Sequence, residues 1–292
     1  MSQTSNSFSE KWHNNKDLAF IQTLNPDSEI HQWIVNRNGF KSAIDLGEYL
    51  NKFNKILDAG CGNGRVTALL RSITDEHKVS ITGIDLTAWD VAQENLAEEK
   101  NVTFYKADLT KDLAQFGNFD FIYCQEVLHH TDNPYGSFKN LVSILNPEGE
   151  IAIYVYRKKA PIREFSDDFI RDRIINLSYD EAMQHCREIT ALGKTLSDLK
   201  IKVDVPEVSL LGIEKGQYDI QRLIYNYFLK CFWNDEFKFE DNAVINFDWF
   251  HPEQCMRYSI EEIEEWFTSQ NLRIIHRNID PYGITMRGVK NK

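Results

Sequence analysis

The chain has 292 residues, of which 42% are hydrophobic, enough for one large domain or for a domain with a sizeable insertion. Its formal charge is −11, from 33 Lys and Arg against 44 Asp and Glu side chains. Proteins bind nucleic acids through cations that displace counterions from phosphates. This acidic balance therefore disfavours a nucleic-acid partner, although a local basic patch is not excluded.

The cysteines and the N-terminal residues indicate the compartment. Five cysteines are present, an odd number, and no two are spaced as CxxC. This predicts reduced thiols rather than disulfides or a zinc site, so no metal is expected. The first residues are polar and hold no signal-peptide core, and no apolar run reaches the roughly 18 residues that a membrane span needs. We therefore expect a soluble protein of the cytoplasm.

Residues 1–54 are expected to form a helical cap or lid segment. Within this polar stretch, Trp33, Ile34 and Arg37 fit one face of a helix. We expect the segment to close over a bound cofactor, with Arg37 meeting the cofactor's carboxylate. The alternative is a helix packed on the edge of a sheet, with Arg37 in solvent.

Strands and helices alternate regularly from residue 55 to residue 156. The expected strands are 55–60, 79–86, 102–109, a strand that opens at 119, and 150–156. The expected helices between them are 64–74, 88–100 and 134–146. This alternation predicts a parallel sheet covered on both faces, with ligands bound beyond the carboxyl ends of the strands.

The alternation stops at residues 157–256, a mainly helical insertion with strongly aromatic stretches. The α/β pattern resumes over 257–292. There, Ser259 and Glu262 are spaced as a capping box for a helix, and two final strands are expected at 272–280 and 284–290. The insertion is expected to serve either as a lid over a substrate or as a dimer contact, and both alternatives stay open.

The stretch "DAGCGNG", residues 58–64, lies where the first strand meets the first helix of the α/β pattern. It places Gly60, Gly62 and Gly64 at alternate positions, just after Asp58. Glycine allows a sharp turn, and it also lets a ligand approach bare backbone. The spacing GxGxG lacks the wider last gap of the dinucleotide pattern GxGxxG, which makes a NAD-dependent dehydrogenase a weak option.

Two further acids strengthen the interpretation of the glycines as a ligand site. Asp85 ends the second expected strand, where a carboxylate can accept hydrogen bonds from two ribose hydroxyls. Asp108 ends the third, where a carboxylate can accept from an adenine amino group while the Leu109 N–H donates. Taken singly, Asp85 could be a helix N-cap and Asp108 a turn residue. Together, three junctions in register predict a nucleoside-shaped site.

At this point the sequence resembles the class I S-adenosylmethionine-dependent methyltransferases of the broad bacterial type. The resemblance rests on "ILDAGCGNGRVTALL", "ITGIDLTAWDVAQENL", "VTFYKADLTKDL", "FDFIYCQEVLHHTDNP" and "FKNLVSILNPEGEIAIYVY". It implies a Rossmann-like α/β fold with a seven-stranded, mostly parallel sheet, helices on both faces and S-adenosyl-L-methionine as cofactor. It implies cofactor contacts from Asp58, Gly60, Cys61, Gly62, Gly64, Asp85, Leu86, Asp108, Leu109, Gln125 and Glu126.

Methyl transfer from a sulfonium is an in-line displacement, so catalysis rests mainly on positioning. A base is needed only for a neutral hydroxyl or a weakly acidic carbon. The candidate catalytic residues are His129, His130, Asp248 and His251, and the candidate substrate contacts are Tyr154, Tyr156 and Trp249. The two adjacent histidines have a structural alternative, because they follow the fourth strand beside the cofactor.

The leading functional hypothesis is a methyltransferase acting on a small-molecule acceptor. A tRNA or protein methyltransferase is the second, and the negative charge disfavours tRNA. A non-catalytic cofactor-binding module that uses its insertion to bind a partner is the third. The sequence does not identify the acceptor atom, and a homodimer is compatible with it.

Overall fold

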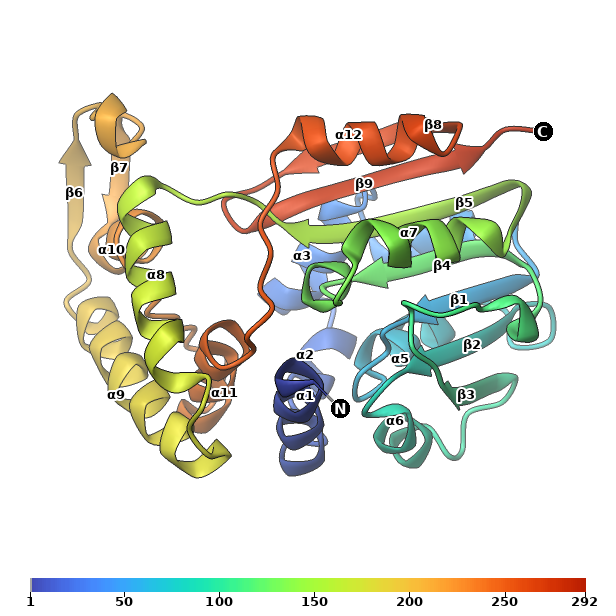
Figure 1. Cartoon of the computed structure of the whole chain (residues 1–292), viewed down its shortest axis with the longest axis horizontal. Coiled ribbons are helices and arrows are strands. Elements are labelled where there is room, and N and C mark those ends of the chain that lie inside the picture. The colour runs from blue at the N-terminus through green and yellow to red at the C-terminus, as the bar shows by residue number, and fades with distance from the viewer. Residues whose placement is uncertain (1) are drawn as a thin grey trace. The chain divides into compact units, whose positions relative to one another are not determined.

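The computed structural model describes residues 2–292, which form two compact units (Figure 1). The helical unit comprises the residues up to Lys11 together with Lys158–Cys255. The α/β unit comprises Trp12–Arg157 and Met256–Lys292. The first helix, α1 (Gln3–Asn14), has residues in both units. None of the helices in the described part of the chain is both long and apolar enough to cross a membrane.

The α/β unit is built on one seven-stranded sheet with the order β3-β2-β1-β4-β5-β9-β8 (Figure 1). Its strands are β1 (Lys55–Ala59), β2 (Ser80–Asp85), β3 (Val102–Lys106), β4 (Phe119–Gln125), β5 (Leu145–Tyr156), β8 (Leu272–Ile279) and β9 (Gly283–Lys290). The first five pair in parallel, and β9 pairs antiparallel with both β5 and β8. The predicted fold class is therefore confirmed, including the last antiparallel strand.

Helices cover both faces of this sheet. They are α2 (Phe20–Leu24), α3 (Glu29–Arg37), α4 (Ala43–Leu50), α5 (Arg65–Ile73), α6 (Trp89–Asn95), α7 (Pro134–Ser143) and α12 (Ile260–Ser269). Alternate strand residues point to opposite faces, so each face forms its own core. One core joins α7 and α12 to the sheet through Phe138, Leu141 and Phe267. The other joins α3, α4 and α5 through side chains that include Leu50 and Leu70.

Local sequence signals account for several of these element ends. The Ser259 side chain accepts the Glu262 N–H and the Glu262 side chain accepts the Ser259 N–H, which confirms the predicted capping box of α12. Helix α7 has Pro134 in its first turn, and the side chain of Asn133 caps it. Each of these caps fixes the first residue of its helix at the point where the helical spacing of apolar residues begins.

The junction between α7 and β5 differs from the prediction. The helix ends at Ser143 rather than at residue 146, and β5 begins at Leu145 rather than at residue 150. Leu145 pairs with Phe119, and the ladder resumes with Glu150 opposite Phe121 after a register shift. The irregular segment includes Glu148 at φ 62°, so the "PEG" turn signal marks a break inside a strand rather than a loop before it.

The helical unit is formed mainly by the predicted insertion. Its elements are α8 (Pro161–Ile174), α9 (Tyr179–Asp198), α10 (Ile220–Tyr227) and α11 (Phe239–Phe250), with a hairpin of β6 (Lys202–Val205) and β7 (Gly216–Asp219). Helix α9 buries Ala182, Met183 and Cys186 at helical spacing. The hairpin was not predicted, because its four-residue strands are half exposed and carry little apolar pattern.

Candidate active site

The glycine loop joins β1 to α5 at the carboxyl edge of the sheet. Gly60, Gly62 and Gly64 have φ angles of 82°, 54° and 83°, in the left-handed region that favours glycine. The N–H groups of Gly60 and Cys61 both donate to the carbonyl of Ile84, at 2.7 and 3.1 Å, which ties the loop to the end of β2. The strand end and the loop thus form one rigid turn.

Neighbouring side chains occupy the space beside each glycine. A Cβ on Gly60 would lie 2.2 Å from Val127, and a Cβ on Gly62 would lie 2.9 Å from the Trp12 ring. A Cβ on Gly64 would lie 2.7 Å from Leu96. The turn and its packing therefore account for all three glycines, and any ligand must be inferred from the polar groups around them.

The acid before the glycines is fully enclosed by protein. Asp58 is 3% exposed and accepts a 2.6 Å hydrogen bond from the Thr67 hydroxyl of α5. Burial raises its pKa from 3.8 to about 6, although the Thr67 bond works in the opposite direction. In this structure Asp58 holds the strand to the following helix. Cys61 is also buried, and burial raises the pKa of its thiol, so this thiol packs in the core.

Asp85 lies at the end of β2 beside the glycine loop. One carboxylate oxygen accepts the Gly62 N–H at 3.1 Å, and the other accepts the N–H groups of Thr87 and Ala88 at 2.8 and 2.9 Å. These bonds are similar to those of a helix N-cap, the alternative role considered for Asp85, because α6 begins just afterwards at Trp89. The Thr87 hydroxyl also donates to the second oxygen, at 3.2 Å, so the oxygen that accepts the Gly62 N–H is the one that keeps acceptor capacity for a hydroxyl group.

Asp108 lies just beyond the end of β3, next to the Asp85 strand. Its Oδ1 accepts from the N–H and the hydroxyl of Thr110, at 2.9 and 2.7 Å. Within residues 2–292, Oδ2 accepts no hydrogen bond, and the Leu109 N–H reaches no acceptor. An unpaired acceptor beside an unpaired donor suits the edge of an adenine ring.

The residue that ends β4 carries an unpaired amide. Gln125 is 9% exposed, and neither its Oε1 nor its Nε2 has a hydrogen-bond partner in the described chain. A buried amide without partners is costly, so such a group indicates a ligand or an ordered water. Gln125 was predicted as a cofactor contact, and its unpaired amide supports that assignment.

Glu126 follows Gln125 with φ 66°, an uncommon conformation for a residue with a side chain. Its carboxylate lies 3.3 Å from Nη1 of Arg37 and 3.3 Å from Nη2 of Arg65. Two guanidinium groups therefore flank one carboxylate in this corner of the site. Arg65 was not predicted, although it directly follows the last glycine of the motif.

Arg37 is 1% exposed and its guanidinium lies between two aromatic rings. It is 3.8 Å from the centroid of Trp33 and 4.2 Å from that of Tyr154. Burial alone would lower the pKa of Arg37, but nearby Glu126 raises it, so the group is charged. The predicted helical face of Trp33 and Arg37 is present in α3, and the alternative of a solvated Arg37 is wrong.

The N-terminal segment is tied to the glycine loop by groups that the sequence did not reveal. Trp12 lies against Gly62, and the side-chain amide of Asn63 donates to the carbonyls of Lys16 and Leu18, at 3.0 and 3.1 Å. The only sequence signal was the Asn inside "GNG", which reads equally well as a turn residue. Residues 12–18 therefore pack on this loop.

The two adjacent histidines lie in a short 3-10 helix, Leu128–His130, just after β4. The rings of His129 and Tyr156 are 3.8 Å apart between centroids, and those of His129 and His130 are 4.3 Å apart. Tyr154 and Tyr156 lie on the same face of β5, and Tyr154 also meets the ring of Trp33 at 5.5 Å. The α/β unit thus brings His129, His130, Tyr154 and Tyr156 into one aromatic group.

The other predicted residues belong to the helical unit. Asp248 pairs with Lys11 at 2.9 Å, and the indole N–H of Trp249 donates to Asp167 at 2.8 Å. The ring nitrogens of His251 lie 2.9 Å from the Ser7 hydroxyl and 3.1 Å from the Leu177 carbonyl. Burial lowers the pKa of His251, so its ring is neutral at neutral pH and serves the packing of this unit.

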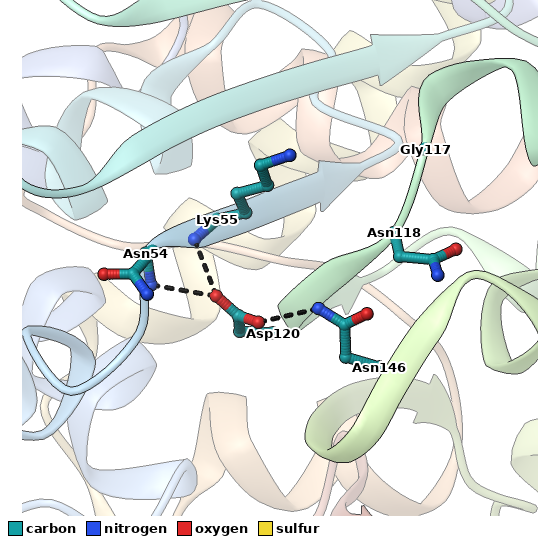
Figure 2. A pocket seen from close by; sticks show the side chains of 6 residues that line it. All are labelled: Asn54, Lys55, Gly117, Asn118, Asp120 and Asn146. Carbon is teal, nitrogen blue, oxygen red and sulfur yellow. Dashed lines mark hydrogen bonds between the residues drawn. The ribbon is translucent and has the colours of Figure 1, made fainter.

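A polar hollow lies at the opposite, amino-terminal edge of the sheet (Figure 2). It is lined by Asn54, Lys55, Gly117, Asn118, Asp120 and Asn146. As Figure 2 shows, Asp120 accepts from the backbone N–H groups of Asn54 and Lys55 and from the amide of Asn146. The hydrogen bonds of the Asp120 carboxylate therefore hold neighbouring chain segments together. Ligands of such sheets bind at the opposite, carboxyl edge.

The site and the sheet order define a methyltransferase of class I fold, and comparison with known proteins identifies the family. The methyltransferase-domain family matches residues 18–195, more than half of the chain. The chain therefore belongs to this family, as the sequence resemblance predicted. The predicted cofactor, S-adenosyl-L-methionine, agrees with the family and the fold.

Two curated proteins are similar to parts of this chain. An uncharacterised protein of Synechococcus sp. is 37% identical over 150 residues, covering 49% of this chain and 34% of that protein. The ubiquinone biosynthesis O-methyltransferase of Coxiella burnetii is 32% identical over 106 residues, covering 34% of this chain and 42% of that protein. The chain thus spans less than half the length of these two curated relatives.

Two solved structures share the fold at low sequence identity. The N-methyltransferase NodS of Bradyrhizobium japonicum in complex with S-adenosyl-L-homocysteine has a TM-score of 0.51 and 13% identity, and covers 100% of both chains. The CurJ carbon methyltransferase has a TM-score of 0.52 and 11% identity, and covers 99% of this chain and 67% of that chain. Their names include nitrogen and carbon acceptors, so the fold does not choose the acceptor atom.

Proposed function

We propose that this chain binds S-adenosyl-L-methionine and transfers its methyl group to a small-molecule acceptor. The observation that carries the proposal is the alignment of three adjacent strand ends in the α/β unit. The glycine loop follows β1, Asp85 ends β2, and Asp108 follows β3 with an unpaired carboxylate oxygen beside the unpaired Leu109 N–H. A nucleoside needs such a row of acceptors and donors.

Each part of the cofactor has a matching group in this arrangement. Asp85 would accept from the ribose hydroxyls, with Leu86 beside it, while Asp108 and Leu109 would meet the adenine edge. The glycine loop and Gln125 would line the methionine portion. Arg37 and Arg65 would attract its carboxylate, since both guanidinium groups already lie 3.3 Å from a carboxylate, that of Glu126.

The bound cofactor supplies a sulfonium methyl group that is already activated for displacement. The chain's own contribution is then to hold the acceptor in line and to exclude water, which can lower a barrier by roughly 7–11 kcal/mol. The aromatic group of His129, His130, Tyr154 and Tyr156 lies just beyond the strands that carry the cofactor groups. His129 or His130 would take a proton if the acceptor is a neutral hydroxyl.

A small-molecule acceptor is favoured over a tRNA by the net charge of −11. The O-methyltransferase relative supports the same class, within the limited length that it matches. Asp248, Trp249 and His251 stay proposed acceptor-side residues, and the insertion stays a proposed lid or dimer contact. The cytoplasmic location also stays a prediction.

Calorimetric binding of S-adenosylhomocysteine tests this proposal. Asp85→Ala should weaken binding about 10- to 100-fold, because it removes hydrogen bonds to a charged acceptor. Asp27→Ala is the matched control, since Asp27 is exposed and its carboxylate makes no hydrogen bond in the described chain. Failure of the unaltered protein to bind would overturn the cofactor assignment and with it the proposed function. Binding without methyl transfer to any small acceptor would leave the cofactor assignment intact and overturn only the acceptor class.

A further inference from the structure

Three cationic side chains surround one buried indole in the helical unit. Trp249 of α11 is 3% exposed. Its ring centroid lies 4.7 Å from the Lys230 ammonium, 5.3 Å from the Arg163 guanidinium and 5.5 Å from the Lys159 ammonium. Cations are attracted to the face of an indole, but three of them also repel one another. Such a group needs negative charge to hold it together.

Asp167 supplies part of that charge and fixes the geometry. Its Oδ2 accepts the Trp249 indole N–H at 2.8 Å and the Arg163 Nε–H at 2.6 Å. Its Oδ1 accepts the backbone N–H of Lys230 at 3.2 Å. Asp167 is fully buried, so indole, guanidinium and lysine backbone are held in one fixed arrangement.

Lys230 is the cation that this arrangement leaves unsatisfied. The residue is 5% exposed, yet among residues 2–292 no acceptor lies within hydrogen-bond distance of its ammonium. The second terminal nitrogen of Arg163 likewise has no acceptor in the described chain. Burying an ammonium without an acceptor is costly, and here burial lowers the pKa of Lys230 to about 8. At neutral pH the group is still mainly charged.

Asp248 is the nearby carboxylate that most favours the charged form of Lys230, but it is shared with Lys11, whose ammonium lies 2.9 Å away. Glu164 lies beside Lys159, where it accepts the backbone N–H of that residue. Arg171 donates to the Trp249 carbonyl and pairs with Asp168, so this pair adds no net charge. The other charged groups here are four cations, Lys11, Lys159, Arg163 and Lys230, and three carboxylates, Glu164, Asp167 and Asp248. The cluster keeps one excess positive charge in a protein whose net charge is −11.

We propose that the helical unit binds an oxyanion, a carboxylate or phosphate group of a small molecule, between Lys230 and Arg163 beside the Trp249 ring. The ammonium and the free guanidinium nitrogen supply two charge-assisted hydrogen bonds, and the indole covers the adjoining carbon atoms. The residues all belong to one unit, so the site does not depend on the cofactor groups of the α/β unit.

Thermal unfolding and calorimetry with sodium phosphate and sodium acetate test the site, with sodium chloride at equal ionic strength as reference. One of the two oxyanions should stabilise the protein beyond chloride, and which one does so distinguishes phosphate from carboxylate. Lys230→Met should weaken this binding about tenfold or more, since a charge-assisted hydrogen bond is worth at least that factor. Lys202→Met, at an exposed lysine of the same unit, should bind like the unaltered protein.

A second measurement does not depend on the folding of a variant. Acetic anhydride labelling of the unaltered protein, resolved by mass spectrometry, should slow at Lys230 when the oxyanion is added and stay constant at Lys202. The proposal is overturned if neither oxyanion exceeds chloride, if Lys230→Met binds as well as the unaltered protein, or if labelling of Lys230 is unchanged. S-adenosylhomocysteine binding, measured in the same samples, reports on the cofactor site separately.

Discussion

Gly60→Ala should destabilise the α/β unit by an amount that divides into two measurable parts. The first is the backbone cost, because φ 82° is left-handed and costs an alanine about 1–2 kcal/mol. The second is overlap, because the new Cβ would lie 2.2, 2.6 and 2.9 Å from three carbons of Val127. Carbon atoms pack best at about 3.5–4.0 Å, and overpacking costs about 1–3 kcal/mol. The expected total is therefore about 2–5 kcal/mol.

Three further variants separate these parts. Gly117 has φ 77°, and a Cβ added there would have no atom within 4 Å, so Gly117→Ala measures the backbone cost alone. Relative to Val127→Ala alone, the double variant Gly60→Ala/Val127→Ala should lose only the backbone cost of about 1–2 kcal/mol, because the overlap is gone. Urea unfolding of the five proteins provides the measurement. Equal destabilisation by Gly60→Ala and Gly117→Ala, or no recovery in the double variant, would refute the packing argument.

Other residues give predictions of the same kind. Arg287→Met should lower the free energy of unfolding in urea by about 3–5 kcal/mol, because it leaves the buried Glu150 carboxylate without the guanidinium that contacts it at 2.5 Å. A loss below about 1 kcal/mol would contradict this. Burial raises the Asp58 pKa from 3.8 to about 6, so the folded state binds this proton more tightly. The resulting stabilisation is complete below about pH 4 and lost as pH rises through 6. Asp58→Asn should remove this loss of about 3 kcal/mol, and an unaltered pH profile would disprove the assignment. Ser259→Ala should lower the free energy of unfolding by about 1 kcal/mol through the lost cap, whereas Ser259→Asp should restore it. Arg37→Met should weaken S-adenosylhomocysteine binding about tenfold in calorimetry, and binding equal to that of the unaltered protein would exclude its carboxylate role.

The sequence predicted what depends on local pattern. Strands and helices of the α/β unit follow from apolar period and turn residues, and the cap of α12 follows from Ser259 and Glu262. The row of Gly60, Asp85 and Asp108 could be placed because parallel strands end at one edge of a sheet. Local pattern failed at β5, where the register shift opposite Phe119 depends on the neighbouring strand.

The parts of the site that escaped prediction depend on partners distant in the chain. The Glu126 carboxylate accepts hydrogen bonds from Arg37, which lies 89 residues away in the chain, and from Arg65, which lies 61 residues away. No spacing rule links such groups, because only the folded sheet brings α3 and α5 to the end of β4. The cluster around Trp249 has the same origin. Its aromatic character was visible in the sequence, but the buried ammonium of Lys230 was not.

The place of β9 between β5 and β8 has a consequence for synthesis on the ribosome. Seven residues of β5 pair with β9, which is made more than a hundred residues later, after the whole helical insertion. Until then the nascent chain presents β5 as an open edge, the kind of surface that invites pairing with another chain. The long separation also slows closure of the sheet. Pairing of residues 283–290 closes this edge of β5, so a chain released before they are made is prone to aggregation.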